Sequence, residues 1–430
     1  MPQCGYLSET SRMIELWRAL TRRGTPVRMA LHGGRHAGLV RAAGIPVDQV
    51  GPPMTAERSL QLVRDSPGLG DVRQSIYTPQ ELIEYALAEA EYLAGSGARA
   101  VVTGFTLTTL LSSRLAGVPL ITEHNGSWLP PLWEHGLLPA PADPPWPWLR
   151  AVPRPVVRRL VNAAPARVGW YCADLNAGAQ QLGVEPVPSM AALTLGDVAL
   201  LTELPAVTGL PATAFTGWRP GRHRGYRPGT RLAVAGPIHA HLPIPLPPEV
   251  DAFLAGPGPV VYVALTSTPP TLVRRAVAAV LGAGPDVRVL VAGTVHGPAD
   301  LTPAGSCGDR VLVGGVLPSH LIMPRVRLAV VTAGQGSLQT AMAAGTPAIG
   351  IPLQPEQDLN VVLLERLRAA VRVAPSAIGR RLTAVVRAAL ADDALAAGAR
   401  RVRARYQDVD GPDAAAQVIE QVAALDPEPR

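Results

Sequence analysis

The chain of 430 residues has no lysine, only three cysteines, and no apolar run of the ~18–20 residues that a membrane-spanning helix needs. The short apolar runs exclude an integral membrane protein. Cys4, Cys172 and Cys307 are odd in number and widely spaced, which excludes a disulfide framework and is typical of the reducing cytoplasm. The segment Met1–Arg12 is polar, so we expect no signal peptide and a cytoplasmic protein.

Aromatic residues are also scarce, at 4%, and arginine supplies all of the basic side chains other than histidine. The net charge of +6 suits an anionic ligand. Proteins that bind nucleic acids gather positive charge together with aromatic residues, and the sequence has no such stripe, so we expect no nucleic-acid partner. With 47% hydrophobic and 17% charged residues, the chain is globular, and its length predicts two or three domains.

The first half of the sequence alternates short apolar runs with amphipathic helical patterns. We expect helices at 13–23, 80–94 and 106–116 and strands at 27–31, 98–102 and 118–122. Strands and helices at this spacing form parallel sheets through right-handed crossovers.

Residues 128–155 interrupt this alternation with closely spaced prolines and tryptophans, which predict no regular structure. Long loops in compact domains are usually functional or mobile. Three interpretations stay open: a packed surface excursion, a wall of an acceptor site, or a weak peripheral membrane contact. The last is suggested by Arg154, Arg158 and Arg159, which follow the tryptophans.

A second interruption, at 219–248, is rich in proline, glycine and arginine and predicts an interdomain linker. A new series of elements follows. We expect strands at 260–265, 287–292, 310–313, 328–332 and 348–351 and helices at 270–281, 337–344, 359–369 and 414–425. The sequence thus predicts an α/β chain of two doubly wound, Rossmann-like domains facing across a cleft, with ligands beyond the carboxyl ends of the strands.

The strongest motif is the strand 328–332, which leads through Ala333-Gly334-Gln335-Gly336-Ser337 into a helix. Small residues let a ligand approach the backbone, and the free N–H groups of a helix N-terminus suit a phosphate. An ordinary glycine-rich turn is the structural alternative. Glu356 and Gln357 follow the next strand at the same edge of the sheet, where a carboxylate beside an amide can bind sugar hydroxyls.

These motifs resemble the donor-site signature of family 1 glycosyltransferases of the GT-B fold, the group of UDP-glucuronosyltransferases and antibiotic-pathway glycosyltransferases. The family pattern is His-Gly-Gly-x-Gly-Ser/Thr, then Ala-x-x-Gly-x-Pro, then Asp/Glu-Gln. Here it is matched by Thr332–Ser337, Ala343–Pro347 and Glu356-Gln357. The resemblance covers most of the chain and includes Gly5–Glu9 near its start.

The resemblance implies an inverting transfer of a sugar from a UDP or dTDP sugar to a small, apolar natural product, without metal or cofactor. It implies an acceptor domain at 1–220, a linker at 221–248, a donor domain at 249–410 and a helix at 411–430 that packs back on the acceptor domain. The implied donor-binding residues are Ser267, Leu317, Thr332, Gly334, Gln335, Gly336, Ser337, Glu356 and Gln357. Acceptor contacts are expected from Asn125, Trp128 and Trp133.

Several departures from the family pattern affect the chemistry. Thr332 replaces the phosphate-binding histidine, and Tyr6 replaces the histidine that serves as general base. The aspartate that orients that histidine aligns with Gly104. The family's first strand is also missing, because only Met1–Cys4 precede the matching glycine. Either the start of the chain is misassigned or the domain is altered.

Candidates for a catalytic base are therefore Tyr6, Glu9 and His124, with Glu123 beside the last. His124 has the most suitable ordinary pKa, whereas a tyrosine hydroxyl near pKa ~10 is a poor base. The histidine could instead bind acceptor or pack in the core. Two functions stay open: an active glycosyltransferase, or a non-catalytic relative that acts as a partner or auxiliary protein. A homodimer is also possible.

Metal-dependent sugar transfer has weak support. Asp408-Val409-Asp410 has the Asp-x-Asp spacing of metal-dependent glycosyltransferases, but it lies in a polar stretch rather than after a buried strand. His239 and His241 lie in the predicted linker without nearby carboxylates. We therefore expect no metal site.

Overall fold

The computed structural model describes residues 1–65, 76–144, 146–239, 241–265, 268–294, 296–302 and 308–425. The chain forms two compact units. The N-terminal unit comprises Met1–Leu138, Pro155–Ile238 and Asp410–Arg430, and the C-terminal unit comprises Pro139–Arg154 and His239–Val409. The proline-rich excursion thus joins the C-terminal unit, although it lies within the first half of the sequence.

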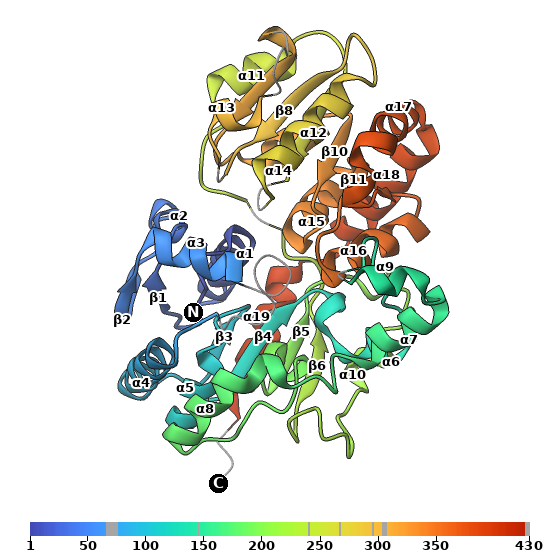
Figure 1. Ribbon diagram of the computed structural model, residues 1–430. Helices are drawn as coiled ribbons and strands as arrows, with labels where there is room; N and C mark the ends of the chain where they lie inside the picture. The colour runs from blue at the N-terminus through green and yellow to red at the C-terminus, as the bar shows by residue number, and fades with distance from the viewer. Residues whose placement is uncertain are drawn as a thin grey trace. The chain divides into compact units, whose positions relative to one another are not determined.

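The C-terminal unit contains one six-stranded parallel sheet in the order β12-β11-β10-β7-β8-β9. Figure 1 labels three of these strands, β8, β10 and β11. The strands of the sheet are β7 (Val260–Ala264), β8 (Arg288–Ala292), β9 (Val311–Gly314), β10 (Leu328–Val331), β11 (Ala348–Gly350) and β12 (Ala370–Arg372). In sequence order this is the doubly wound arrangement 3-2-1-4-5-6 read from the other edge. The strand order reverses between β7 and β10, and ligands of such sheets bind beyond the carboxyl ends of the strands at this point.

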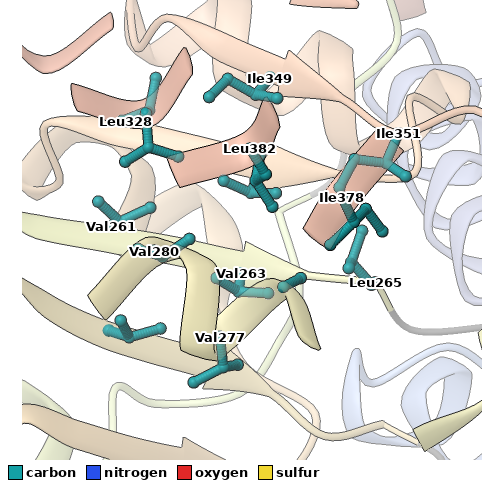
Figure 2. Close-up of a cluster of buried hydrophobic side chains, with 14 of the residues drawn as sticks. Val261, Val263, Leu265, Val277, Val280, Leu328, Ile349, Ile351, Ile378 and Leu382 are labelled. Carbon is teal, nitrogen blue, oxygen red and sulfur yellow. The ribbon is translucent and has the colours of Figure 1, made fainter. Parts of the chain in front are cut away.

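Alternate residues of these strands form the hydrophobic core on one face of the sheet. Val261 and Val263 of β7 and Leu328 of β10 face the helix α12 (Pro270–Leu281) and a turn that includes Leu382 (Figure 2). The period of two places every second residue on this face. Since the intervening residues are buried too, both faces are covered, as expected for a parallel sheet.

The helices of the C-terminal unit agree with the predicted alternation of strands and helices. Besides α12 they are α11 (Pro248–Ala255), α13 (Pro298–Leu301), α14 (Ser319–Ile322), α15 (Gln335–Ala344), α16 (Pro355–Arg366), α17 (Thr383–Ala391) and α18 (Asp393–Gln407). The helix α16 starts earlier than the expected 359, because Pro355 at its first turn is already preorganised for helical geometry.

The N-terminal unit contains two separate parallel sheets. β1 (Met29–Gly33) pairs only with β2 (Val47–Met54), and the other sheet has the order β3-β4-β5-β6. Its strands are β3 (Val101–Thr103), β4 (Leu120–His124), β5 (Val198–Leu201) and β6 (Arg231–Val234). Within the described residues no strand joins β1 to β3, where the resemblance predicted a missing strand.

Residues 1–4 form hydrogen bonds with residues in or next to each of the two sheets of the N-terminal unit. The amino group of Met1 donates to the Val102 carbonyl at 2.7 Å, in β3. The His36 N–H donates to the Cys4 carbonyl at 2.9 Å, just beyond β1. Residues 1–4 therefore link the two sheets without forming a strand.

The helices of the N-terminal unit surround these sheets. They are α1 (Leu7–Arg22), α2 (Ala37–Ala42), α3 (Ala56–Asp65), α4 (Pro79–Gly95), α5 (Thr109–Ala116), α6 (Pro130–Glu134), α7 (Arg154–Ala163), α8 (Ala173–Leu182), α9 (Pro205–Thr208), α10 (Thr213–Thr216) and α19 (Gly411–Ala424). The C-terminal helix α19 packs against α1, and Arg23 forms ion pairs with its Asp413 and Glu420. No helix in the described part of the chain is long and apolar enough to cross a membrane.

Besides the earlier start of α16, other expectations from the sequence differ from this structure. The helix α1 begins at Leu7 rather than at 13. Residues 231–234, expected in the linker, form β6, and the division between the units follows Ile238. The proline-rich stretch is not irregular throughout, because it contains α6 and the short 3₁₀ helix 147–151. Proline is compatible with the first turn of a helix, where its missing N–H has no partner in any case.

Candidate functional site

In the C-terminal unit, the predicted phosphate turn joins β10 to α15. Gly334 is the N-cap residue, with an extended backbone (φ −64°, ψ 154°), and the helix begins at Gln335. The first N–H groups of a helix have no partner within it, and they carry the positive end of the helix dipole. The turn also follows one of the two strands at which the strand order reverses, so it lies where this fold binds ligands.

The backbone of this turn is both strained and open. Ala333 is fully buried and has a φ of 63°, a left-handed conformation that is unfavourable for a residue with a side chain. Such strain persists where the surroundings enforce it and is often found at functional sites. A Cβ atom added to Gly334 would meet no other atom within 4 Å, so a ligand can approach the backbone there.

The side chains of this turn divide into two groups. Gln335 points into the unit and is 9% exposed, with its Nε2 atom 3.5 Å from Oε1 of Gln339. Thr332, Gly336 and Ser337 are half-buried. The Ser337 hydroxyl donates to the Gly334 carbonyl at 3.1 Å, which fixes the first turn of α15. Gln335 is therefore a supporting residue, whereas Thr332 and Ser337 retain partial access to solvent.

The second predicted donor motif, Glu356-Gln357, lies in the first turn of α16. Oε1 of Gln357 accepts a hydrogen bond from the Leu353 N–H at 2.8 Å. Nδ2 of Asn360 donates to Oε1 of Glu356 at 2.6 Å and to the Ala333 carbonyl at 3.1 Å. Asn360 thus connects the two motifs and holds the strained residue of the turn.

Asn360 was not among the residues singled out from the sequence. Its position four residues after Glu356, on the same face of a helix, is the signal that could have found it. Two other predicted donor residues give less information. Ser267 lies outside the described residues, and Leu317 is 3% exposed, with its side chain packed close to Gly314.

In the N-terminal unit, two buried carboxylates meet beside Gly104. A Cβ atom added to Gly104 would lie 2.7 Å from Oε1 of Glu123 and 3.0 Å from Cδ of Glu9. The resemblance places an aspartate at this position in the family. The two glutamates, from α1 and β4, therefore occupy the space that a side chain at 104 would take.

One carboxylate oxygen of Glu9 is hydrogen-bonded and, within the described residues, the other is not. Oε1 accepts hydrogen bonds from the N–H groups of Gln3 at 3.0 Å and Gly104 at 3.1 Å. Oε2 is buried and has no hydrogen-bond partner among the described residues. Burial raises the pKa of Glu9 from 4.5 to about 6, since the charged form is poorly solvated. The carboxylate is thus oriented, ionised near neutral pH, and able to accept a proton.

Glu123 is instead neutralised by a cation. Nε of Arg12 lies 2.8 Å from both oxygens of Glu123, and both side chains are buried. Burial still raises the pKa of Glu123, and Arg12 opposes that rise. Arg12 also lies one helical turn from Glu9 on α1, so the same cation affects both acids.

His124 occupies the end of β4 and is 4% exposed. Burial lowers its pKa to about 3, and the charge of Arg12 contributes in the same direction. Its Nε2 atom has no partner among the described residues. The imidazole is therefore neutral at physiological pH and a weaker base than the ordinary pKa of histidine led us to expect.

Aromatic side chains extend from this cluster. The rings of Tyr6 and Phe105 meet edge to face with centroids 5.5 Å apart, and the ring of Trp128 lies 6.3 Å from that of Phe105. Trp128 is half-buried and can present part of its ring to a ligand. Phe105 was missed from the sequence, although it directly follows Gly104.

The two other predicted acceptor residues are buried. Trp133 is 4% exposed, and its Nε1 donates to the Tyr226 hydroxyl at 3.0 Å, so it packs in the core rather than facing a ligand. Asn125 is 3% exposed and accepts a hydrogen bond from Ser127. It supports the loop that follows His124.

The candidate metal ligands from the sequence are the Asp408–Asp410 motif and the pair His239 and His241. Asp410 accepts a hydrogen bond from the Asp413 N–H and caps α19. The rings of His239 and His241 lie 5.2 Å apart, and that of His320 lies 5.3 Å from His241. Within the described residues, no group of three or more histidine, cysteine or acidic side chains has the geometry to hold a metal ion.

Comparisons with known proteins place this geometry in context. No family model matches the chain. It is 28% identical over 342 residues to a PGL/p-HBAD biosynthesis glycosyltransferase of Mycobacterium tuberculosis, covering 78% of this chain and 72% of that protein. It is 34% identical over 183 residues to the O-mycaminosyltylonolide 6-deoxyallosyltransferase of Streptomyces fradiae, covering 41% of each.

Solved structures share the whole architecture. The spinosyn forosaminyltransferase SpnP has a TM-score of 0.64 at 14% identity, covering 99% of this chain and 98% of that one. The glycosyltransferase VinC, in complex with dTDP, has a TM-score of 0.61 at 17% identity, covering 97% and 96%. At such identities these similarities establish the fold.

Proposed function

The chain is a glycosyltransferase of the GT-B fold, and we propose that it transfers a sugar from a nucleoside diphosphate to a hydroxyl group of a small, apolar acceptor, with inversion at the anomeric carbon. The observation that carries this proposal is the open turn at Gly334 before α15. It presents the backbone N–H groups of the first turn of α15 to an anion at the ligand-binding edge of the sheet.

The donor is a dTDP or UDP sugar in this proposal. Its diphosphate binds the backbone from Gly334 to Ser337, and the Thr332 hydroxyl donates one further hydrogen bond. Thr332 carries no charge, so the helix dipole and the backbone groups stabilise most of the negative charge on the leaving diphosphate. The VinC structure holds dTDP, which supports a thymidine or uridine donor on the same fold.

The sugar is oriented by Glu356 and Gln357. Asn360 holds Oε1 of Glu356, which fixes the orientation of that carboxylate at the first turn of α16. Gln357 uses its Oε1 atom on Leu353 and retains its amide N–H groups as donors. A hydrogen-bond acceptor and a donor on adjacent residues can discriminate the pattern of hydroxyl groups on a hexose.

Glu9 is the general base in this proposal. As the acceptor oxygen attacks the anomeric carbon, its proton passes to Oε2 of Glu9, the bond from that carbon to the diphosphate oxygen breaks, and the nucleoside diphosphate leaves with the bonding electrons. A base works best when its pKa lies near the working pH. Glu9, with a pKa of about 6, meets this condition better than His124, with a pKa of about 3.

The acceptor is apolar because the groups around Glu9 are aromatic. Phe105 follows Gly104, whose N–H binds Glu9, and its ring lies against those of Tyr6 and Trp128. Such a wall stabilises a flat or hydrophobic molecule and excludes water that would compete for the glycosyl group.

Nucleotide binding tests the donor site directly. A nucleotide present at ~100 times its Kd stabilises the folded state by about 2.7 kcal/mol, which is readily seen as a rise in Tm. We expect such a rise with dTDP or UDP, a smaller one with GDP, and release of the favoured diphosphate when an acceptor is supplied with its sugar donor.

The matched variants are Gly334→Leu and Gly38→Leu. Each glycine has free space around its Cβ position and no φ in the left-handed region, so both variants should fold. Leucine at 334 would occupy the space of the diphosphate and abolish the rise in Tm, whereas leucine at 38 should preserve it. If wild-type protein shows no rise with any of the nucleotides, or if Gly334→Leu retains it, the proposed donor site is wrong.

A further inference from the structure

The imidazole of His124 is a buried polar group that the proposed sugar transfer does not use. The residue is 4% exposed and lies at the carboxyl end of β4. Its Nε2 atom is buried and has no hydrogen-bond partner among the described residues. A polar atom that is buried without a partner costs stability, and nearly all buried polar atoms in folded proteins are hydrogen-bonded. The exception at His124 therefore needs an explanation.

The protonation of this ring follows from its surroundings. Burial and the charge of Arg12 lower its pKa to about 3, so the ring is neutral at physiological pH. A hydrogen bond to the backbone of Thr194 opposes this shift, which means that the ring is the donor of that bond. Since Nε2 has no partner in the described part of the chain, the donating atom is Nδ1. A neutral imidazole that is protonated at Nδ1 carries a lone pair on Nε2 and accepts hydrogen bonds there.

Hydrogen bonds within the N-terminal unit hold this ring in place. The His124 carbonyl accepts a hydrogen bond from the Thr202 N–H at 2.8 Å. The Thr194 carbonyl accepts another from the Thr122 hydroxyl at 2.9 Å. The Thr194 hydroxyl donates to the Trp128 carbonyl at 3.3 Å. Thr194 therefore connects the imidazole to the backbone of Trp128.

The imidazole and the proposed base flank the same strand end. Successive side chains of a strand point to opposite faces, so Glu123 and His124 lie on opposite faces of β4. The Glu123 carboxylate lies at Gly104, where Glu9 is also found. Ligands of parallel sheets bind beyond the carboxyl ends of the strands, where one molecule can reach both faces. A molecule at this end of β4 thus has Glu9 on one side and His124 on the other.

Both of these groups are hydrogen-bond acceptors. Oε2 of Glu9 and Nε2 of His124 are buried, and neither has a partner within the described ranges of the chain. An ionised carboxylate only accepts hydrogen bonds, and the same holds for Nε2 of a ring protonated at Nδ1. Two acceptors need two donors, and the hydroxyl that receives the sugar supplies only one of them.

We propose that Nε2 of His124 accepts a hydrogen bond from a second hydroxyl or N–H group of the acceptor, so that the enzyme selects small apolar molecules with two hydrogen-bond donors. The first donor is the hydroxyl whose proton passes to Glu9, and the second binds and orients the molecule. This inference rests on the proposed function, because it specifies the acceptor of that reaction. It makes His124 an acceptor-binding residue rather than the general base.

The thermal stability of ligand-free variants tests whether His124 serves binding rather than packing. Leucine is similar to histidine in volume but has no polar atom to leave unpaired. The Tm of His124→Leu should therefore equal that of wild type or lie about 2–4 °C above it, since the cost of the buried atom is removed. The Thr194 carbonyl keeps its hydrogen bond from Thr122 in this variant. If the Tm falls instead, the imidazole contributes to the core and the proposal is wrong.

His32→Leu is the matched control for this comparison. His32 is also 4% exposed, but its Nε2 atom lies 2.8 Å from Oε1 of the fully buried Glu89. The same substitution there removes a partner from a buried carboxylate and should lower the Tm. A fall in Tm that is smaller at His32 than at His124 would overturn the distinction between the two histidines.

Calorimetric titration with small aromatic alcohols tests the second hydrogen bond directly. The probes are 1-naphthol, 2-naphthol and the isomeric dihydroxynaphthalenes. Wild type should bind at least one dihydroxy compound about tenfold more tightly than either naphthol, through the added hydrogen bond. His124→Leu should lose this preference, and His124→Gln, whose amide oxygen also accepts, should retain part of it. If wild type prefers no dihydroxy compound, or if His124→Leu keeps the preference, the proposal is wrong.

These measurements separate this inference from the proposed sugar transfer, because neither the Tm comparison nor the titration needs a sugar donor. A preference that depends on His124, in a protein that binds neither dTDP nor UDP, would overturn the donor site and leave the acceptor assignment standing. Donor binding and sugar transfer without any role for His124 would overturn only the present inference.

Discussion

Replacing Glu9 by glutamine tests two properties of the proposed base: the cost of its buried charge to the stability of the fold, and its role in accepting the proton during sugar transfer. Burial raises the pKa of Glu9 from 4.5 to about 6 in the folded chain. In the unfolded chain the carboxyl titrates near 4.5, so the folded state holds the proton more tightly. Below pH ~4.5 both states are protonated and Glu9 costs nothing; above pH ~6 the buried carboxylate is charged and opposes folding.

The magnitude follows from the size of the shift. A rise of ~1.5 units at about 1.4 kcal/mol per unit is roughly 2 kcal/mol. Glu9→Gln retains an oxygen for the N–H groups of Gln3 and Gly104 but cannot ionise. The free energy of unfolding of the variant, relative to wild type, should therefore increase by about 2 kcal/mol between pH 4.5 and pH 7.

Urea unfolding at a series of pH values measures this difference. Any fixed effect of the substitution cancels, because only the change with pH is compared. Glu91→Gln, at an exposed position of α4, is the control and should show no such change. The same Glu9→Gln protein should lose sugar transfer by ~10²–10⁴-fold, and wild-type kcat should fall below pH ~6 as Glu9 is protonated.

Two results would refute this reasoning. A pH-independent stability difference between Glu9→Gln and wild type would mean that the carboxyl is not destabilised by burial. Full activity in the variant would mean that another group accepts the proton, even if the stability prediction holds.

Three further perturbations test other parts of the structure. Arg12→Leu leaves the buried Glu123 without its cation and should destabilise the chain by ~3–5 kcal/mol in urea unfolding. The double variant Arg12→Leu with Glu123→Leu should recover most of this loss. Equal losses in the two variants would contradict the pairing. Asn360→Ala removes the hydrogen bonds to Ala333 and Glu356. It should raise KM for the donor about tenfold with a small change in kcat. An unchanged KM would show that Asn360 does not organise the donor site. Arg372→Ala removes the cation that pairs with Asp358, and burial already raises the pKa of this acid, so its pKa in the folded state should rise further. The loss of stability relative to wild type should therefore grow as pH rises from 5 to 8. A loss that is constant over this range would indicate that Asp358 remains well solvated.

Local patterns explain why the turn between β10 and α15 could be predicted from the sequence. A buried strand, small residues and a helix from Gln335 onward follow one another directly, so the turn depends on interactions within a few residues. Five of the six strands in this sheet follow from the alternation of strands and helices and from the handedness of their crossovers, whereas β12 was not expected. The same patterning placed Glu356 and Gln357 after β11, in the first turn of α16.

The proposed base required the tertiary structure. The sequence shows that Gly104 lacks a carboxylate, but not that Glu9 and Glu123 come from two other elements to occupy that space. It also gives His124 its ordinary pKa, because desolvation is determined by residues that are distant in sequence. Neither the strand at 231–234 nor the attachment of residues 139–154 to the C-terminal unit could be read from local patterns, since both depend on long-range pairing.

The sequence by itself determined the fold class, most strands and helices of the C-terminal unit and the position of the glycine-rich turn before α15, because propensity, periodicity and turn chemistry act over short distances along the chain. Only the tertiary structure decided which carboxylate combines a fixed orientation with a raised pKa. It also decided how Asn360 joins Ala333 to Glu356, and which of Trp128 and Trp133 retains an accessible ring. These properties depend on burial and on contacts between distant residues, and burial sets both the pKa of an acid and the exposure of a ring.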